Sequence, residues 1–124
     1  SDSKAAFQKL MDSLLLPHGV SCTEKYQSPF IYQWGYPFLW PGENYHCFEA
    51  AGTLGLMDLQ KRIGLRYLDN VTQVFLEKKR LFEAYDAEKG GLNDRKEYPA
   101  TEMLGWTAGT FELCYHTLGF DQKN

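Results

Sequence analysis

The sequence predicts a mainly α-helical fold: a compact bundle of about four helices, with an aromatic-rich irregular or short-hairpin segment between the first and second helices. Two observations carry this prediction. Apolar residues recur at helical spacing in four stretches, and proline and glycine interrupt residues 17–44. The chain has 124 residues, of which 44% are hydrophobic and 23% charged, as in ordinary globular domains. We therefore expect a single helical domain over residues 1–124.

The first predicted helix covers residues 4–16. Asp2 or Ser3 can cap its start, and Pro17 ends it because proline cannot continue the helical hydrogen bonds. The apolar side chains of this stretch repeat every three or four residues, which places them on one face. They are Phe7, Leu10, Met11, Leu14 and Leu15.

The second predicted helix runs from Asn44, a good capping residue, to Gly64. Gly52 and Gly55 lie inside it. Each glycine costs a helix about 1 kcal/mol relative to alanine, so the pair indicates either a weaker helix or close packing against a neighbour.

The third predicted helix begins at the capping residue Asp69 and carries its apolar stripe as far as Tyr85, before Gly90 and Gly91 close it. Charged residues occupy its opposite face, including the basic run 78–80. The sequence thus predicts that residues 82–85 are helical.

The fourth predicted helix has Pro99 in its first turn, where the missing N–H is harmless. Gly105 and Gly109 stand one turn apart and would let another helix approach closely, and residues 121–124 are expected to fray. The apolar residues of this helix recur at alternating intervals of four and three, the pattern of a packing seam. They are Leu104, Ala108, Phe111, Tyr115 and Leu118.

Residues 17–44 contain too many prolines and glycines for a helix and too many aromatic residues for a disordered linker. Trp34, Tyr36, Phe38 and Trp40 share one parity, so an extended segment would present all four on one side. Two interpretations stay open. The segment is either a buried lid across the helices or an exposed surface that binds a partner or a small ligand.

The composition excludes several classes of function. The formal net charge is −3, with 13 basic and 16 acidic residues, so no basic stripe predicts nucleic-acid binding. No apolar run approaches the roughly 18 residues that a membrane span needs. Three cysteines are too few for a disulfide framework, which favours reduced thiols and a cytoplasmic location. The first 16 residues do not resemble a signal peptide, although the absence of an initiating methionine leaves room for a removed leader.

A thiol nucleophile is one candidate for catalytic chemistry. Cys47 falls in the first turn of the second predicted helix, where free backbone N–H groups and the helix dipole favour a thiolate. His116 in the fourth predicted helix could serve as the base. The alternative is that Cys47 is an ordinary buried thiol on the apolar face of its helix.

Metal ligation is not expected. The chain has three Cys/His pairs, but none has the spacing that zinc sites use, and adjacent helical residues point about 100° apart. No phosphate-binding glycine loop or other nucleotide motif is present. We therefore expect neither a metal nor a cofactor.

The leading functional hypothesis is a non-enzymatic protein-interaction or inhibitory module, because the chain has many aromatic residues and no catalytic signature. Its protein partner would bind the aromatic surface, while a small ligand or a homodimer is compatible with the same residues. The alternative hypothesis is a small thiol-dependent hydrolase or transferase that uses Cys47 and His116. The residues expected to bind the partner are Trp34, Tyr36, Phe38, Trp40 and Tyr45.

Overall fold

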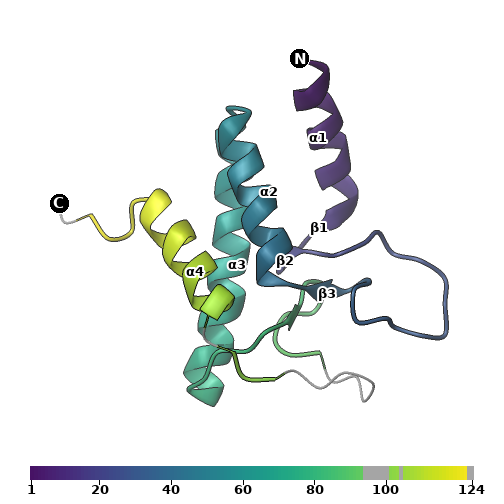
Figure 1. The fold of residues 1–124 in the computed structure, drawn as a ribbon, viewed down its shortest axis with the longest axis vertical. Coiled ribbons are helices and arrows are strands. Elements are labelled where there is room, and N and C mark those ends of the chain that lie inside the picture. Colours follow the sequence, from purple (N-terminus) through teal and green to yellow (C-terminus); the bar gives the residue numbers. More distant parts are fainter. Residues whose placement is uncertain (94–100, 104, 123–124) are drawn as a thin grey trace.

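The computed structural model describes residues 1–93, 101–103 and 105–122 and shows that the protein is mainly α-helical, as predicted (Figure 1). Four helices lie in the described part of the chain: α1 (Asp2–Leu14), α2 (Pro41–Thr53), α3 (Met57–Lys78) and α4 (Gly105–Thr117). Two short antiparallel sheets accompany them. Strand β1 (Leu15–Leu16) pairs with β2 (Gly19–Val20), and β3 (Phe38–Leu39) pairs with β4 (Tyr85–Asp86).

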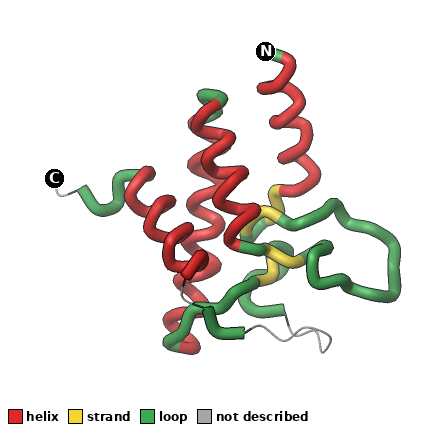
Figure 2. The backbone as a smooth tube through the Cα atoms, in the orientation of Figure 1, coloured by secondary structure: helices red, strands yellow, loops and turns green. Residues whose placement is uncertain are grey.

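The core lies where α2, α3 and α4 pack on one another, while α1 stands at the edge of this group (Figure 1). Helix α3 buries residues along its length, including Ile63 and Tyr67, whereas Met11 is the one buried residue of α1. Figure 2 shows both sheets at the same end of the molecule, where α1 and α3 terminate and α2 and α4 begin. The connecting segments from distant parts of the sequence therefore meet at this end.

The boundary between the second and third helices differs from the prediction. The chain leaves α2 after Thr53 and turns at Gly55, whose φ of 72° is a left-handed conformation that glycine adopts without strain. Helix α3 then runs through Gly64, where a helix end was expected. Glycine fits there because Phe48 and Leu118 occupy the space that a side chain would need: a Cβ atom would lie 2.7 Å from the ring of Phe48.

The third helix also ends earlier than predicted. It stops at Lys78, and Lys79 takes the left-handed conformation with a φ of 61°. The prediction that residues 82–85 are helical is therefore wrong. Phe82 forms an isolated bridge with Glu102, Tyr85 begins β4, which pairs with β3, and all four residues are buried.

Asn70 of α3 fixes this returning segment. Its side-chain Nδ2 donates hydrogen bonds to the carbonyl oxygens of His18 and Asp86, both at 3.1 Å, and its Oδ1 accepts the N–H of Gly91 at 2.8 Å. One buried amide thus joins α3 to two segments that are distant in sequence.

The fourth helix begins at Gly105, and the predicted start at Pro99 lies outside the described residues. The predicted close approach at Gly105 and Gly109 is not seen, because no atom of another described segment lies within 4 Å of the position that a Cβ would take at either glycine. The close packing occurs at Gly52 and Gly64 instead, against Gln60 and Phe48.

The aromatic segment is partly buried and partly exposed. Tyr36, Phe38 and Trp40 are buried, whereas Trp34 is 51% exposed. The four side chains do not lie on one side of a strand because the chain turns at residues 33–37 before β3 begins. Within the described part of the chain, no helix is long and apolar enough to cross a membrane.

Candidate functional site

Three tryptophans from two distant parts of the sequence form an aromatic cluster at the end of the helices. The rings of Trp34 and Trp40 stack with their centroids 4.1 Å apart and an interplanar angle of 25°. Trp106 meets Trp40 edge-on, with centroids 5.8 Å apart. Offset stacking and edge contacts are the favourable geometries for aromatic pairs, so these rings hold one another in place.

Local structure explains why Trp40 is the fixed member of this cluster. It caps α2, and Pro41 follows it at the first helical position, where proline is well tolerated. Its ring Nε1–H donates to the carbonyl oxygen of Gln33 at 2.8 Å, so the buried indole has a polar partner. The side-chain hydroxyl of Thr110 donates to the carbonyl oxygen of Pro41 and ties α4 to the start of α2.

A segment that contains a buried carboxylate packs against the aromatic cluster. Glu83 is 7% exposed, and its neighbour Ala84 packs against Phe38 and Trp40. The backbone around it is held on both sides. Thr107 of α4 donates its hydroxyl to the carbonyl oxygen of Phe82 at 2.6 Å, and the N–H of Glu83 donates to the carbonyl oxygen of residue 101 at 2.9 Å. The segment that carries Glu83 therefore lies between β3 and the first turns of α4.

Glu83 and Asp86 are the two buried carboxylates among the described residues, and their surroundings differ. Oδ1 of Asp86 accepts the backbone N–H groups of Glu88 and Lys89 at 2.9 and 2.8 Å. Asp86 therefore has a structural role: it closes the turn that follows β4. Glu83 is next in sequence to Ala84, which packs against Phe38 and Trp40.

Partly exposed aromatic rings together with a buried carboxylate can bind and act on a neutral, ring-shaped ligand. Trp34 and Trp106 are partly exposed, at 51% and 36%, so part of each ring remains available to a ligand. Large aromatic faces bury the apolar side of a ligand, while a few placed polar groups fix its orientation. A buried glutamate can also act as a general acid or base.

The structure separates the residues that the sequence assigned to partner binding. Trp34 and Trp40 belong to the aromatic cluster, and Phe38 packs beneath Trp40 with ring centroids 6.2 Å apart. Tyr36 is buried in the loop and accepts a cation–π contact from Lys25, whose Nζ lies 5.5 Å from the ring centroid. Tyr45 is 37% exposed on α2 and meets the His46 ring edge-on.

The structure does not bring Cys47 and His116 together as a catalytic pair. Burial, with the nearby Glu43 carboxylate, raises the pKa of the Cys47 thiol to about 11, so the thiol stays protonated near neutral pH. His116 lies on the exposed side of α4, where its Nδ1 interacts with the carboxylate of Asp121. No hydrogen bond joins Cys47 to His116 in the described part of the chain. Across the same residues, no three His, Cys, Asp or Glu side chains converge as a metal would need.

Sequence reasoning missed Glu83 and Trp106. Glu83 was interpreted only as a flanking charge on a solvated helix face, because the helical pattern seemed to continue to Tyr85. The available signal was a single carboxylate between Phe82 and Ala84, directly after a charged run. Trp106 lies between Leu104 and Ala108 of the fourth predicted stripe but does not share its periodicity, so only the contact with Trp40 reveals its place.

Comparison with known proteins identifies relatives of this arrangement. A sequence model of the family described as Trehalase matches residues 2–118. The periplasmic trehalases of Salmonella paratyphi B and Salmonella newport are each 30% identical to this chain over 97 residues, which cover 77% of this chain and 16% of each relative. The chain therefore spans about one sixth of the length of these relatives.

A solved structure agrees at the level of the fold. Neutral trehalase Nth1 from Saccharomyces cerevisiae superposes with a TM-score of 0.69 at 22% identity, over 94% of this chain and 21% of that protein. The match covers nearly all of the present chain, so the helices and their connecting segments follow an arrangement found within a much longer protein.

These matches contradict the functional predictions made from sequence. The predicted non-enzymatic protein-interaction or inhibitory module is wrong, as are the expectation that the chain is more likely not an enzyme and the thiol-dependent alternative. The predicted protein partner is also wrong, since trehalase relatives point to a small sugar ligand. The prediction failed because aromatic rings can contact both small ligands and proteins, so a high aromatic content does not distinguish the two. The burial of Glu83 is a property of the fold and cannot be read from the sequence.

Proposed function

The chain belongs to the trehalase family, and from this membership we propose that its aromatic cluster and Glu83 form part of a glycoside hydrolase active site that acts on trehalose. The single observation that carries the proposal is a buried carboxylate, Glu83, next in sequence to Ala84, which packs against Phe38 and against Trp40 of the aromatic cluster. The names of the Salmonella relatives supply the substrate.

The aromatic cluster suits a sugar because a pyranose ring has apolar C–H groups on its faces and hydroxyl groups at its rim. The stack of Trp34 on Trp40 offers a flat surface that is already held in position before the ligand arrives. Such preorganisation lowers the entropy cost of binding. The nearby carboxylate can accept hydrogen bonds from sugar hydroxyls.

Hydrolysis of a glycosidic bond needs two carboxyl groups. One group protonates the departing oxygen, and the other activates water or attacks the sugar carbon. Burial against aromatic residues is the environment in which a carboxyl group can be tuned for this task. We assign Glu83 to one of the two roles, because it is buried and is next in sequence to a residue that packs against Trp40.

The second carboxyl group is expected outside the residues described here. The chain corresponds to about one sixth of the Salmonella relatives and 21% of the yeast protein. In this proposal the segment supplies one wall of the active site, made of the tryptophans and Glu83. The opposite wall comes from sequence that corresponds to the rest of those longer proteins.

The proposal is tested by replacing Glu83 with Gln in the polypeptide that carries residues 1–124 and measuring glucose release from trehalose. The change keeps the size of the side chain and removes its acid–base function, so kcat should fall by about 100-fold or more. Binding of trehalose, followed by tryptophan fluorescence, should be retained. A variant with undiminished kcat would show that Glu83 is not catalytic.

Trp34→Ala supplies the complementary test. Trp34 is half exposed, so its removal should leave the helices folded while weakening trehalose binding by about tenfold. Phe30→Ala is a matched control, because Phe30 is 61% exposed in the same loop and is not part of the aromatic cluster. Equal losses in the two variants would argue against a specific role for Trp34.

A further inference from the structure

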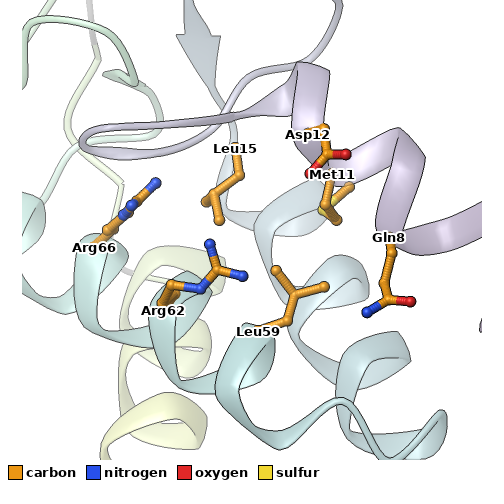
Figure 3. Close-up of a pocket in the computed structure, with 7 residues that line it drawn as sticks. All are labelled: Gln8, Met11, Asp12, Leu15, Leu59, Arg62 and Arg66. Atoms are coloured by element: carbon orange, nitrogen blue, oxygen red, sulfur yellow. The ribbon is translucent and has the colours of Figure 1, made fainter. Parts of the chain in front are cut away.

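A second cavity lies between α1 and α3, apart from the aromatic cluster (Figure 3). Its volume is about 280 Å³. This is near the lower end of the range for small-molecule sites, roughly 300 Å³. None of its lining residues belongs to the aromatic cluster. They are Gln8, Met11, Asp12 and Leu15 from α1 and β1, with Leu59, Arg62 and Arg66 from α3.

Two arginines on consecutive turns of α3 give the cavity its chemistry. Arg66 is half-buried, and its Nη1 donates to the carbonyl oxygen of Leu16 at 3.0 Å, which holds the side chain in place. One hydrogen bond leaves most of the five N–H donors of a guanidinium unused. In Figure 3 the guanidinium of Arg62 lies between Leu15 and Leu59, within the cavity.

Arg62 makes no hydrogen bond or ion pair with any other residue in the described part of the chain. Asp12 also lines the cavity, but its carboxylate is not within ion-pair distance of either arginine. Two positive charges and one negative charge leave the lining with a formal charge of +1. Met11 and Leu59 are 2% and 6% exposed, so the accessible lining of the cavity is mostly polar.

We propose that this cavity binds a small ligand through a phosphate group, held by Arg62 and Arg66. Guanidinium groups match phosphate oxygens in shape and can bind them in bidentate fashion, which a lone ammonium group cannot do. The volume exceeds that of inorganic phosphate and leaves room for a small organic group beside it. The neutral amide of Gln8 can hydrogen-bond to that group from the α1 side.

The test is a calorimetric and NMR titration of the 124-residue chain with two phosphate probes, inorganic phosphate and glucose 6-phosphate, and with glucose as the uncharged control. Both phosphate probes should bind with one-to-one saturation, and glucose should not perturb residues of the cavity. Stronger binding of glucose 6-phosphate would identify a phosphorylated metabolite, and equal binding would identify free phosphate as the ligand. The readout does not involve trehalose, so it can fail or succeed independently of the proposed hydrolase function.

Variants locate the site. Arg62→Gln should weaken phosphate binding by about tenfold or more, because a charge-assisted pair of hydrogen bonds to phosphate is lost while no hydrogen bond or ion pair among the described residues is removed. Asp12→Asn should strengthen binding by about two- to fivefold, since it removes a repelling charge. Lys61→Gln is the matched control: Lys61 is an exposed cation on the same helix that does not line the cavity.

Two results would overturn the proposal. One is the absence of saturable binding by both phosphate probes. The other is an equal loss of affinity in Arg62→Gln and Lys61→Gln, which would indicate only a diffuse attraction of anions to a basic helix face. Arg66→Gln is a second variant of the site, and because Arg66 also holds Leu16, its circular dichroism spectrum must be compared with that of the unchanged chain.

Discussion

At the residue scale, the protein uses burial to separate groups that look alike in the sequence. Most of its 16 acidic residues are solvated, whereas Glu83 and Asp86 are buried in the described part. One carboxylate oxygen of Asp86 accepts two backbone N–H groups, whereas Glu83 is next in sequence to Ala84, which packs against Phe38 and Trp40. The carboxylate of Asp86 thus stabilises a turn, whereas in our proposal the carboxylate of Glu83 takes part in a reaction.

Burial also determines the protonation of the three cysteine thiols. Burial is the main cause that raises the pKa of the Cys22 and Cys114 thiols to about 12 and that of Cys47 to about 11. The carboxylate of Glu43 adds to the effect at Cys22 and Cys47, and that of Glu49 does so at Cys114. A raised pKa means that the folded state keeps the thiols protonated, which disfavours nucleophilic chemistry at neutral pH.

Alkylation by iodoacetamide should therefore be slow in the folded protein. At pH 8 the thiolate fraction of Cys47 should be about 100-fold lower than in the urea-unfolded chain, whose thiols titrate near their ordinary pKa. The labelling rate should rise about tenfold per pH unit until the pH approaches 11. Mass spectrometry of the labelled peptides measures it, and rapid labelling of Cys47 at pH 7 would contradict the expected protonation.

At the element scale, glycine positions decide how the helices pack. Gly64 lies in the middle of α3, where alanine would favour the helix by about 1 kcal/mol. Its Cβ, however, would lie 2.7 Å from Phe48 and 2.8 Å from Leu118. Gly109 of α4 has no atom within 4 Å of the same position. The two sites therefore have opposite consequences for one substitution.

Gly64→Ala should destabilise the protein by about 1–2 kcal/mol, because overpacking against the fully buried Phe48 exceeds the gain in helix propensity. Gly109→Ala should stabilise it by about 0.5–1 kcal/mol, since only the propensity term remains. Urea unfolding followed by circular dichroism measures both. If the two variants changed the free energy of unfolding in the same direction, the assignment of Gly64 as a packing glycine would be wrong.

At the scale of the whole molecule, the helices contribute unequally to the core. Helix α3 buries a row of residues against α2 and α4, whereas α1 buries Met11 alone and reaches the core from one edge (Figure 1). The cavity between α1 and α3 is a consequence of this looser contact. The proposed sugar site therefore lies by the tightly packed helices α2, α3 and α4, whereas the proposed phosphate site lies at the looser contact between α1 and α3.

Amide hydrogen exchange should show this difference. Protection should be highest in the central turns of α3, around Ile63 to Val71, and lower throughout α1, because opening a helix that buries little apolar surface costs less free energy. Exchange measured by mass spectrometry on peptides from both helices provides the comparison. Equal protection of α1 and α3 would mean that α1 is as firmly packed as the rest.

The sequence by itself determined the helical class, because helical spacing of apolar residues depends only on which faces must be buried. It also indicated the irregular aromatic segment, since Pro29, Gly35 and Pro37 prevent a helix there. It could not place the break between α2 and α3. Gly55 and Gly64 look equivalent in the sequence, and only contact with Phe48 explains why the second one lies inside a helix.

The tertiary structure alone decided the candidate site. Trp34 and Trp106 are far apart in the sequence, and both rings contact Trp40. The segment that carries Glu83 reaches the same region because β4 pairs with β3 and Thr107 of α4 holds the carbonyl oxygen of Phe82. It likewise decided that Cys47 is a protonated, partly buried thiol rather than a nucleophile. Periodicity reports which side of a helix faces inward, whereas function here depends on contacts between segments, and those are set by how the helices pack.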